Sequence, residues 1–261
     1  MPLTKSFIYL IVMIAVVAAF ILLVVTGHEV DSFLFLTAIW LIVIAYFVHF
    51  SASLRRFAKT LHEECDPERF VQKCRHLMSD RFARKAAKHQ FMLRLSLCMG
   101  LYAGGDFDEM RLTLDDLAAS PFISKSNMGA IMYQTLLFAS LMQQKSFSAA
   151  KDKLDALENM ATNAKLNKQQ RDLLKDELRF SRAVLDMELG DYTNAEAVFN
   201  ETFVNAKQKY TRVVARLQLA DVYAHYGRRE MAKAALEYVV RNGNKLHAVS
   251  FAKQRLQEEN L

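Results

Sequence analysis

Two apolar runs dominate the first fifty residues. Residues 7–25 and 32–50 each contain nineteen consecutive positions without Asp, Glu, Lys or Arg. About 20 apolar residues are enough for a helix to cross the hydrocarbon core of a bilayer. Because only residues 26–31 separate the runs, the pattern predicts an antiparallel hairpin of two transmembrane helices. The alternative is a pair of buried core helices, although runs this long without charge are uncommon in soluble domains.

The charged residues around these runs predict the orientation of the hairpin. Lys5 precedes the first run, Arg55, Arg56 and Lys59 follow the second, and the six-residue link contains only acidic charge. Cations are retained on the cytoplasmic side, so we expect both termini in the cytoplasm and the hairpin in the cell membrane. A cleavable signal peptide is an alternative for the first run, and it would leave the C-terminal domain on the same side. The spans lack charged residues, which favours an anchor over a transporter.

After residue 50 the apolar positions recur with helical spacing, as at Leu93, Leu97 and Leu101. No segment shows the two-residue alternation of a half-buried strand, so we expect an all-α protein. Residues 51–81 are expected to form a basic helical stalk and a cap helix, with Asp66 as N-cap and Pro67 at the first helical position. Residues 82–261 are expected to form a domain of successive helices, closed by a second cap at residues 245–261.

Turn-like residues interrupt this helical domain at four related places: Gly105, Lys145, Gly190 and Gly227. They lie 40, 45 and 37 residues apart, so each interval can hold two helices. Small or apolar residues stand at the same distances from each turn, which predicts helix crossings and core contacts. Seven residues before the turns are Cys98, Phe138, Ala183 and Ala220; five after them are Met110, Ala150, Ala195 and Ala232; nine after them are Leu114, Leu154, Phe199 and Leu236.

This pattern resembles the tetratricopeptide repeat family, whose 34-residue unit is a helix-turn-helix with small residues at crossing points. The best match is residues 216–240, in which Ala220, Tyr223, Gly227, Ala232 and Leu236 occupy the expected positions. The resemblance implies an α-solenoid of about four degenerate repeats over residues 82–261. The chain departs from the family in its longer spacings and in lacking the tryptophan near each repeat start. A generic solenoid of helical hairpins is therefore the alternative.

In the tetratricopeptide family, the first helix of each repeat lines a concave groove that holds partner peptides. The same register here implies a methionine-rich groove, and methionine suits surfaces that accept several partners. The alternative is that this stripe belongs to the core. The implied groove residues are Met92, Met99, Met132, Met142, Gln143, Met187, Glu188, Asp221 and His225, and the same positions include Tyr102 and Glu177.

Net charge identifies a second candidate surface. Residues 51–100 carry eleven Lys or Arg and five Asp or Glu, which accounts for the formal net charge of +6. Arg55, Arg56 and Lys59 stand nearest the expected bilayer, where anionic headgroups attract cations. We do not expect nucleic acid as a partner, because no aromatic-basic interleaving or recognised binding module accompanies these charges.

Catalytic chemistry has little support in the sequence. None of the common nucleophile, metalloprotease or phosphate-loop motifs occurs, so we expect no cofactor and no enzymatic activity. His62, Cys65, Cys74 and His76 superficially offer four zinc ligands, but Cys74 and His76 are two residues apart on one expected helix and point apart. We therefore expect no metal site, and with Cys98 the cysteines are expected to be packed thiols.

These features lead to one functional hypothesis and two alternatives. The leading hypothesis is a membrane-anchored scaffold or adaptor whose cytoplasmic helical-repeat domain binds a protein or peptide partner. The first alternative is a structural or assembly subunit whose groove is filled within a homo- or hetero-oligomer. The second is an enzyme with an unrecognised site.

Overall fold

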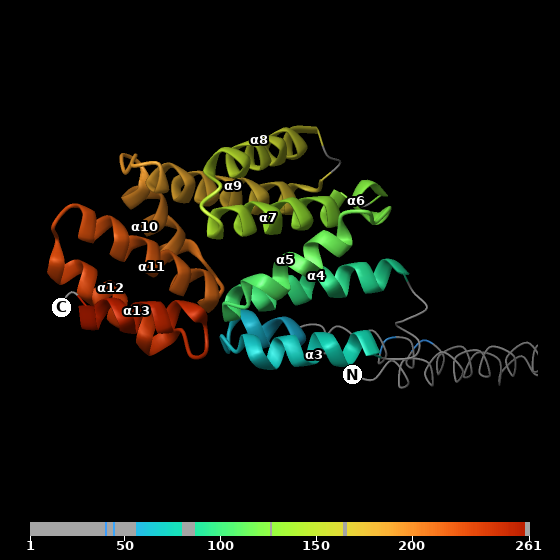
Figure 1. The fold of residues 1–261 in the computed structure, drawn as a ribbon, viewed down its shortest axis with the longest axis horizontal. Coiled ribbons are helices and arrows are strands. Elements are labelled where there is room, and N and C mark those ends of the chain that lie inside the picture. Colours follow the sequence, from blue (N-terminus) through green and yellow to red (C-terminus); the bar gives the residue numbers. More distant parts are fainter. Residues whose placement is uncertain are drawn as a thin grey trace, which may run out of the picture.

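The computed structural model describes Trp40, Ile44 and residues 56–79, 87–125, 127–163 and 166–258. These residues form helices and turns, and no strand occurs among them, so the all-α prediction is confirmed (Figure 1). Within this described part, no helix has both the length and the apolar character needed to cross a membrane. The runs 7–25 and 32–50 lie outside it, except for Trp40 and Ile44.

The described part of the chain is a succession of helices joined by short turns. Four antiparallel pairs, α4 with α5, α7 with α8, α9 with α10 and α11 with α12, follow α3 and precede α13. The helices are α3 (Pro67–Ser79), α4 (Ala87–Gly104), α5 (Phe107–Leu117), α6 (Phe122–Lys125), α7 (Asn127–Gln143), α8 (Phe147–Asn163), α9 (Lys168–Glu188), α10 (Ala195–Asn205), α11 (Lys209–His225), α12 (Arg229–Asn242) and α13 (His247–Glu258).

A sharp reversal separates the segment before α3 from α3 itself. Residues 56–62 are helical, and the chain then turns through Cys65, whose φ of 52° lies in the left-handed region. The Asp66 carboxylate accepts a hydrogen bond of 3.0 Å from the backbone N–H of Arg69, which caps the first turn of α3. Pro67 is the first residue of that helix, as predicted.

The four predicted turns all adopt one conformation. Gly105, Lys145, Gly190 and Gly227 have positive φ angles of 89°, 56°, 93° and 68°. In each turn the N–H of this residue donates to the carbonyl three residues earlier, and the next N–H donates to the carbonyl five residues before it, at 2.8–3.2 Å. This pattern satisfies the last carbonyls of the first helix and reverses the chain. Lys145 adopts this left-handed conformation although its Cβ atom disfavours a positive φ.

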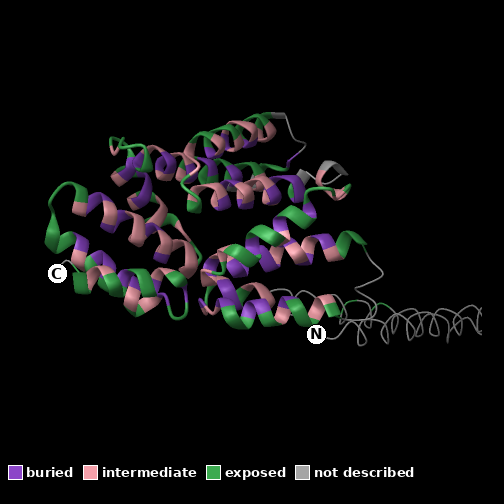
Figure 2. Cartoon of the chain, viewed as in Figure 1, coloured by how far each residue is buried: buried purple, intermediate pink, exposed green. Residues whose placement is uncertain are grey.

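The positions that align around these turns form the contacts within and between pairs. All twelve predicted positions are buried, with 0–6% of each residue exposed. Figure 2 shows buried residues on the faces where helices meet and exposed residues on the outer faces. The four residues five positions after the turns, Met110, Ala150, Ala195 and Ala232, are almost completely inaccessible at 0–2%. These four positions therefore belong to the core.

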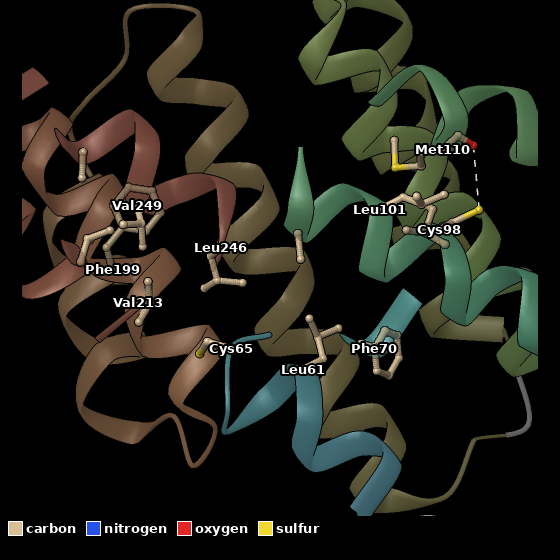
Figure 3. Packing of buried hydrophobic residues seen from close by; sticks show 14 of the residues in the cluster. Leu61, Cys65, Phe70, Cys98, Leu101, Met110, Phe199, Val213, Leu246 and Val249 are labelled. Carbon is tan, nitrogen blue, oxygen red and sulfur yellow. Dashed lines mark hydrogen bonds between the residues drawn. The ribbon is translucent and has the colours of Figure 1, made fainter. Parts of the chain in front are cut away.

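The buried residues divide into two hydrophobic clusters. The smaller one lies between α7, α8 and α9 and includes Phe138, Leu154 and Leu185. The larger one continues from Leu61 before α3 to Ala252 in α13. Figure 3 shows members of the larger cluster from the segment around α3, Leu61, Cys65 and Phe70, and from the segment around α13, Leu246 and Val249; Cys65 lies on the side of Leu246.

The two ends of this helical array contact each other. The backbone N–H of Lys245 donates to the carbonyl of Cys65 at 3.2 Å, and the Asn244 side-chain amide donates to the carbonyl of Glu64 at 2.8 Å. Lys245 also pairs with Glu68 at 2.7 Å, and α13 contacts α4. The array therefore closes into a ring (Figure 1), although the sequence predicted only a cap at each end.

Candidate partner-binding site

Side chains from the first helices of all four pairs influence one another electrostatically. Tyr102 near the end of α4 makes a side-chain hydrogen bond with Gln143 at the end of α7. Glu177 in the middle of α9 acts electrostatically on Tyr102 and on Tyr210, which lies at the start of α11. We call this cluster of Tyr102, Gln143, Glu177 and Tyr210 the central recess.

The position of Glu177 shows that the recess is open to water. Glu177 is exposed to solvent, yet burial raises the pKa of its carboxyl group. Water therefore reaches this carboxylate, while neighbouring protein atoms reduce its hydration. In the described part of the chain, no ion pair joins this carboxylate to a cation. The recess therefore presents an accessible and uncompensated negative charge.

Both tyrosines of the cluster lie close enough to Glu177 for its charge to act on them. Burial raises the pKa of Tyr102, and the hydrogen bond with Gln143 partly opposes that effect. Burial also raises the pKa of Tyr210, and Tyr102, Glu177 and Cys65 act in the same direction. Both hydroxyls are therefore neutral at physiological pH and can donate hydrogen bonds.

The segment before α3 supplies one further ring at the recess. The imidazole of His62 meets the ring of Tyr210 edge-on, with centroids 6.3 Å apart. Burial lowers the pKa of His62, so the ring is neutral near pH 7. Its Nδ1 atom is buried and has no hydrogen-bond partner among the described residues. His62 is therefore an uncharged part of the wall.

The predicted methionine stripe divides between the inner surface and the core. Met92 and Met99 on α4 and Met132 on α7 are partly buried against the larger cluster, and Met142 is partly buried against the smaller one. Met187 is only 5% exposed and belongs to the larger cluster itself. Of the two interpretations left open by the sequence, core packing describes Met187, whereas the other four keep some exposed surface.

The polar residues predicted to lie in the groove have different surroundings. Gln143 and Glu188 are exposed, and Gln143 contributes to the central recess. Asp221 forms an ion pair with Arg255 of α13, so its carboxylate already has a cationic partner within the chain. His225 stacks on Tyr192 with parallel rings 3.7 Å apart, at the turn between α11 and α12. The predicted acidic end near Asp221 and His225 is therefore separate from the recess.

The basic residues expected at the membrane surface are partly described. Arg56 and Lys59 are exposed on the helical segment 56–62, while Arg55 lies outside the described residues. Exposure leaves both described side chains free to meet a charged surface. Among the described residues, neither of them forms an ion pair with an acidic side chain.

The cysteines are packed thiols. Cys65, Cys74 and Cys98 are free and completely buried, and burial raises the pKa of Cys74 and of Cys98 to about 12. Thiols with such pKa values are poor metal ligands and poor nucleophiles. Among the described residues, no three His, Cys, Asp or Glu side chains come together in an arrangement that could hold a metal ion.

Sequence reasoning found part of the recess and missed the rest. The repeat register placed Tyr102, Gln143 and Glu177 on the inner face, but it started the α11 stripe at Val214 and left out Tyr210. Tyr210 lies four residues before Val214, one helical turn away on the same face, so extending the stripe would have included it. His62 could not be placed, because its contribution depends on ring closure.

The chain was also compared with known proteins. No family model, no curated protein and no solved structure matches it.

Proposed function

We propose that this protein is a membrane-anchored scaffold or adaptor whose helical-repeat domain binds a protein or peptide partner on its inner face. The observation that carries the proposal is the central recess, to which all four helix pairs contribute a side chain. The inner surfaces of stacked helical repeats are typical binding sites.

A tetratricopeptide-like solenoid is our proposal for the architecture of this domain. Its support is the common conformation of the four turns at Gly105, Lys145, Gly190 and Gly227 and the burial of the residues aligned around them. Ring closure departs from an open solenoid, since the last helix contacts the first pair. Closure limits the partner to the inner surface that remains exposed, around Gln143 and Glu177.

For the first fifty residues we propose a transmembrane hairpin of residues 7–25 and 32–50, with both termini in the cytoplasm. Trp40 and Ile44 are helical and lie one turn apart, and 60% and 53% of their surface is exposed. Large apolar side chains exposed on one helix face suit contact with lipid. The exposed Arg56 and Lys59 follow on the side where cations are retained, and there they can contact anionic headgroups.

Site-specific photo-crosslinking in cells tests the binding proposal. A crosslinking amino acid replaces Gln143 or Glu188 on the inner helices, and Leu112 or Met231, exposed on α5 and α12, in the controls. We expect one polypeptide to be captured from the inner positions and not from the outer ones. Capture of a second copy of this chain would support the assembly-subunit alternative. Equal capture from inner and outer positions would refute the proposal.

Membrane topology needs a separate measurement. Full-length chain carrying a C-terminal tag is treated with protease in intact cells and in cells with a permeabilised membrane. We expect the tag to be protected until the membrane is permeabilised and the chain to remain in the membrane fraction after alkaline extraction. Digestion of the tag in intact cells would contradict the proposed orientation.

A further inference from the structure

The segment before α3 runs antiparallel to α3 and shows where the first fifty residues join the helical domain. The ring of Phe57 meets the ring of Phe70 with centroids 4.6 Å apart, and Lys73 donates a hydrogen bond to the buried hydroxyl of Thr60. Because the chain reverses at Cys65, going back from Thr60 to Phe57 means moving along α3 towards its end. The chain upstream of this segment therefore leaves the domain on the side where α3 ends.

The end of α3 lies beside the start of α4. The side-chain amide of Gln90 donates to the backbone carbonyl of Met78 at 3.1 Å, and the two helices lie side by side (Figure 1). Three basic residues are exposed here, and we call them the basic end of α3 and α4: His76, Lys88 and His89. Lys88 forms no ion pair with an acidic side chain of the described residues.

The opposite end of the same two helices is acidic. A Cβ atom on Gly104 would lie 3.6 Å from Pro67, so the end of α4 meets the start of α3. Residues 63–68 and 105–109 contain no Lys or Arg and seven acids: Glu63, Glu64, Asp66, Glu68, Asp106, Asp108 and Glu109. Five of these acids pair with four cations: Arg69, Arg75, Arg111 and Lys245. Seven acids against four cations leave this end negative, and the 18 residues of α4 hold it about 27 Å from the basic end.

The apolar run that we propose to cross the membrane ends close to the level of the basic end. It stops at residue 50, six residues before Arg56, a distance of about 9 Å at helical rise and at most about 20 Å for an extended chain. Arg56 stands nine residues before the reversal at Cys65 and Cys74 nine after it, so these two lie at a similar level, and Ser79 is about 8 Å further along α3. The end of α3 is therefore within about 12 Å of the level where the run ends, which is comparable with a Debye length of about 8 Å.

We propose that the basic end of α3 and α4 rests on the membrane surface, where Lys88 and the exposed Arg56 contact anionic lipid headgroups. Charge selects a lipid surface as the occupant, because anionic headgroups attract the basic end and repel the acidic end of the same helices. This contact holds α3 and α4 upright on the bilayer and sets the height of the partner-binding inner surface above it. The inference rests on the proposed transmembrane hairpin and adds a second membrane contact to that anchor.

Fluorescence quenching at single positions of the full-length chain in lipid vesicles tests this contact. Cysteine replaces His76 or His89 at the basic end, and it replaces Asp108, whose side chain is 98% exposed, in the control. The native cysteines are buried, so a thiol-reactive fluorophore labels the introduced one. The vesicles contain phosphatidylcholine alone or an equimolar mixture with phosphatidylglycerol, and a trace of lipid carries a nitroxide quencher on its headgroup.

We expect the quenching at positions 76 and 89 to be at least about twofold stronger than at position 108, to increase with phosphatidylglycerol and to decrease in high salt. With the label at position 76, Lys88→Glu should weaken the quenching and Lys88→Arg should preserve it. Lys151→Glu, at an exposed position on α8, changes the net charge by the same amount and should have no effect. Circular dichroism confirms that each variant is folded.

Two results would overturn the inference and leave the proposed hairpin standing. One is equal quenching at positions 76, 89 and 108 in a chain that floats with the vesicles. The other is strong quenching at positions 76 and 89 that depends neither on phosphatidylglycerol nor on the charge at position 88. A chain that does not float with the vesicles refutes the hairpin, and the second contact with it.

Discussion

The imidazole of His247 lies directly against Gly105, so that a Cβ atom on Gly105 would stand 2.5 Å from Nδ1 of His247. The same imidazole meets the ring of Phe107 edge-on, with centroids 5.4 Å apart. Gly105 belongs to the turn of the first helix pair and His247 begins the last helix, so this contact is part of ring closure. Glycine is needed here both for its φ of 89° and for the space that His247 occupies.

Replacing Gly105 with alanine should therefore cost more than the same change in an equivalent turn. Gly190→Ala meets nothing within 4 Å and should cost about 1 kcal/mol, for its positive φ alone. Gly105→Ala adds a steric clash and should cost about 2–4 kcal/mol. Urea unfolding of the full-length chain followed by circular dichroism measures both losses.

A double-mutant cycle separates the clash from the backbone effect. His247→Ala removes the obstructing ring, so Gly105→Ala combined with His247→Ala should lose less stability than the sum of the two single changes, by about 1 kcal/mol or more. The cycle of Gly190→Ala with His247→Ala is the control and should be additive. Additivity in both cycles would mean that the contact between Gly105 and His247 contributes nothing.

These residues also show which parts of the fold could be read from the sequence. The turns at Gly105, Gly190 and Gly227 were predictable because glycine before a polar residue interrupts an apolar helical pattern. Lys145 was predictable only from its spacing to the other turns. Ring closure was not predictable from the sequence. It depends on contacts between the segment before α13 and the segments around α3 and α4, such as those of Asn244 with Glu64 and of His247 with Gly105. Contacts between segments so far apart leave no periodic signal in the sequence.

The candidate site was predictable to a similar degree. Repeat register locates one inner face on each first helix, which is enough to place Gln143 and Glu177 near one another. It cannot tell which positions on that face remain exposed, because exposure depends on how strongly the array curves. Met187 shows the limit: its register matches the groove, but curvature of the array buries it in the larger cluster.

The ion pair between Asp221 and Arg255 should stabilise the last helix against α11. Only 28% of the Asp221 side chain and 16% of the Arg255 side chain are exposed, so removing the carboxylate leaves a poorly hydrated guanidinium. Asp221→Asn should cost about 1–3 kcal/mol in urea unfolding. Glu109→Gln removes a 2.7 Å pair with Arg75 in which both side chains are about half exposed, and it should cost less than about 0.5 kcal/mol. Equal losses would contradict this difference in burial.

The three cysteines should be unreactive in the folded protein. All are buried, and a thiol with a pKa of about 12, as burial produces for Cys74 and Cys98, is ionised in only about one molecule in ten thousand at pH 8. A thiol reagent such as Ellman's reagent should therefore label no cysteine in native full-length chain and three after unfolding in urea. Rapid labelling of one thiol without denaturant would show that its helix opens locally.

The ionisation of Glu177 should make the protein less stable as the pH rises. Burial raises the pKa of this carboxyl group in the folded state, so the folded chain binds its proton more tightly than the unfolded chain does. The free energy of unfolding therefore decreases as the pH rises from below the unfolded pKa to above the folded pKa. Tyr102 and Tyr210, on which the carboxylate acts, stay protonated throughout this pH range, so they do not change the direction of this effect on the free energy of unfolding.

Glu177→Gln removes this ionisation and should therefore raise the stability of the chain at pH 7 but not at pH 4, where the carboxyl group of the wild type is already protonated. Melting curves of full-length wild type and variant at both pH values give the difference. Asp176→Asn, at an exposed neighbouring position, should not show the same pH-dependent gain. A stabilisation by Glu177→Gln that is equal at pH 4 and pH 7 would mean that ionisation of Glu177 does not destabilise the folded chain.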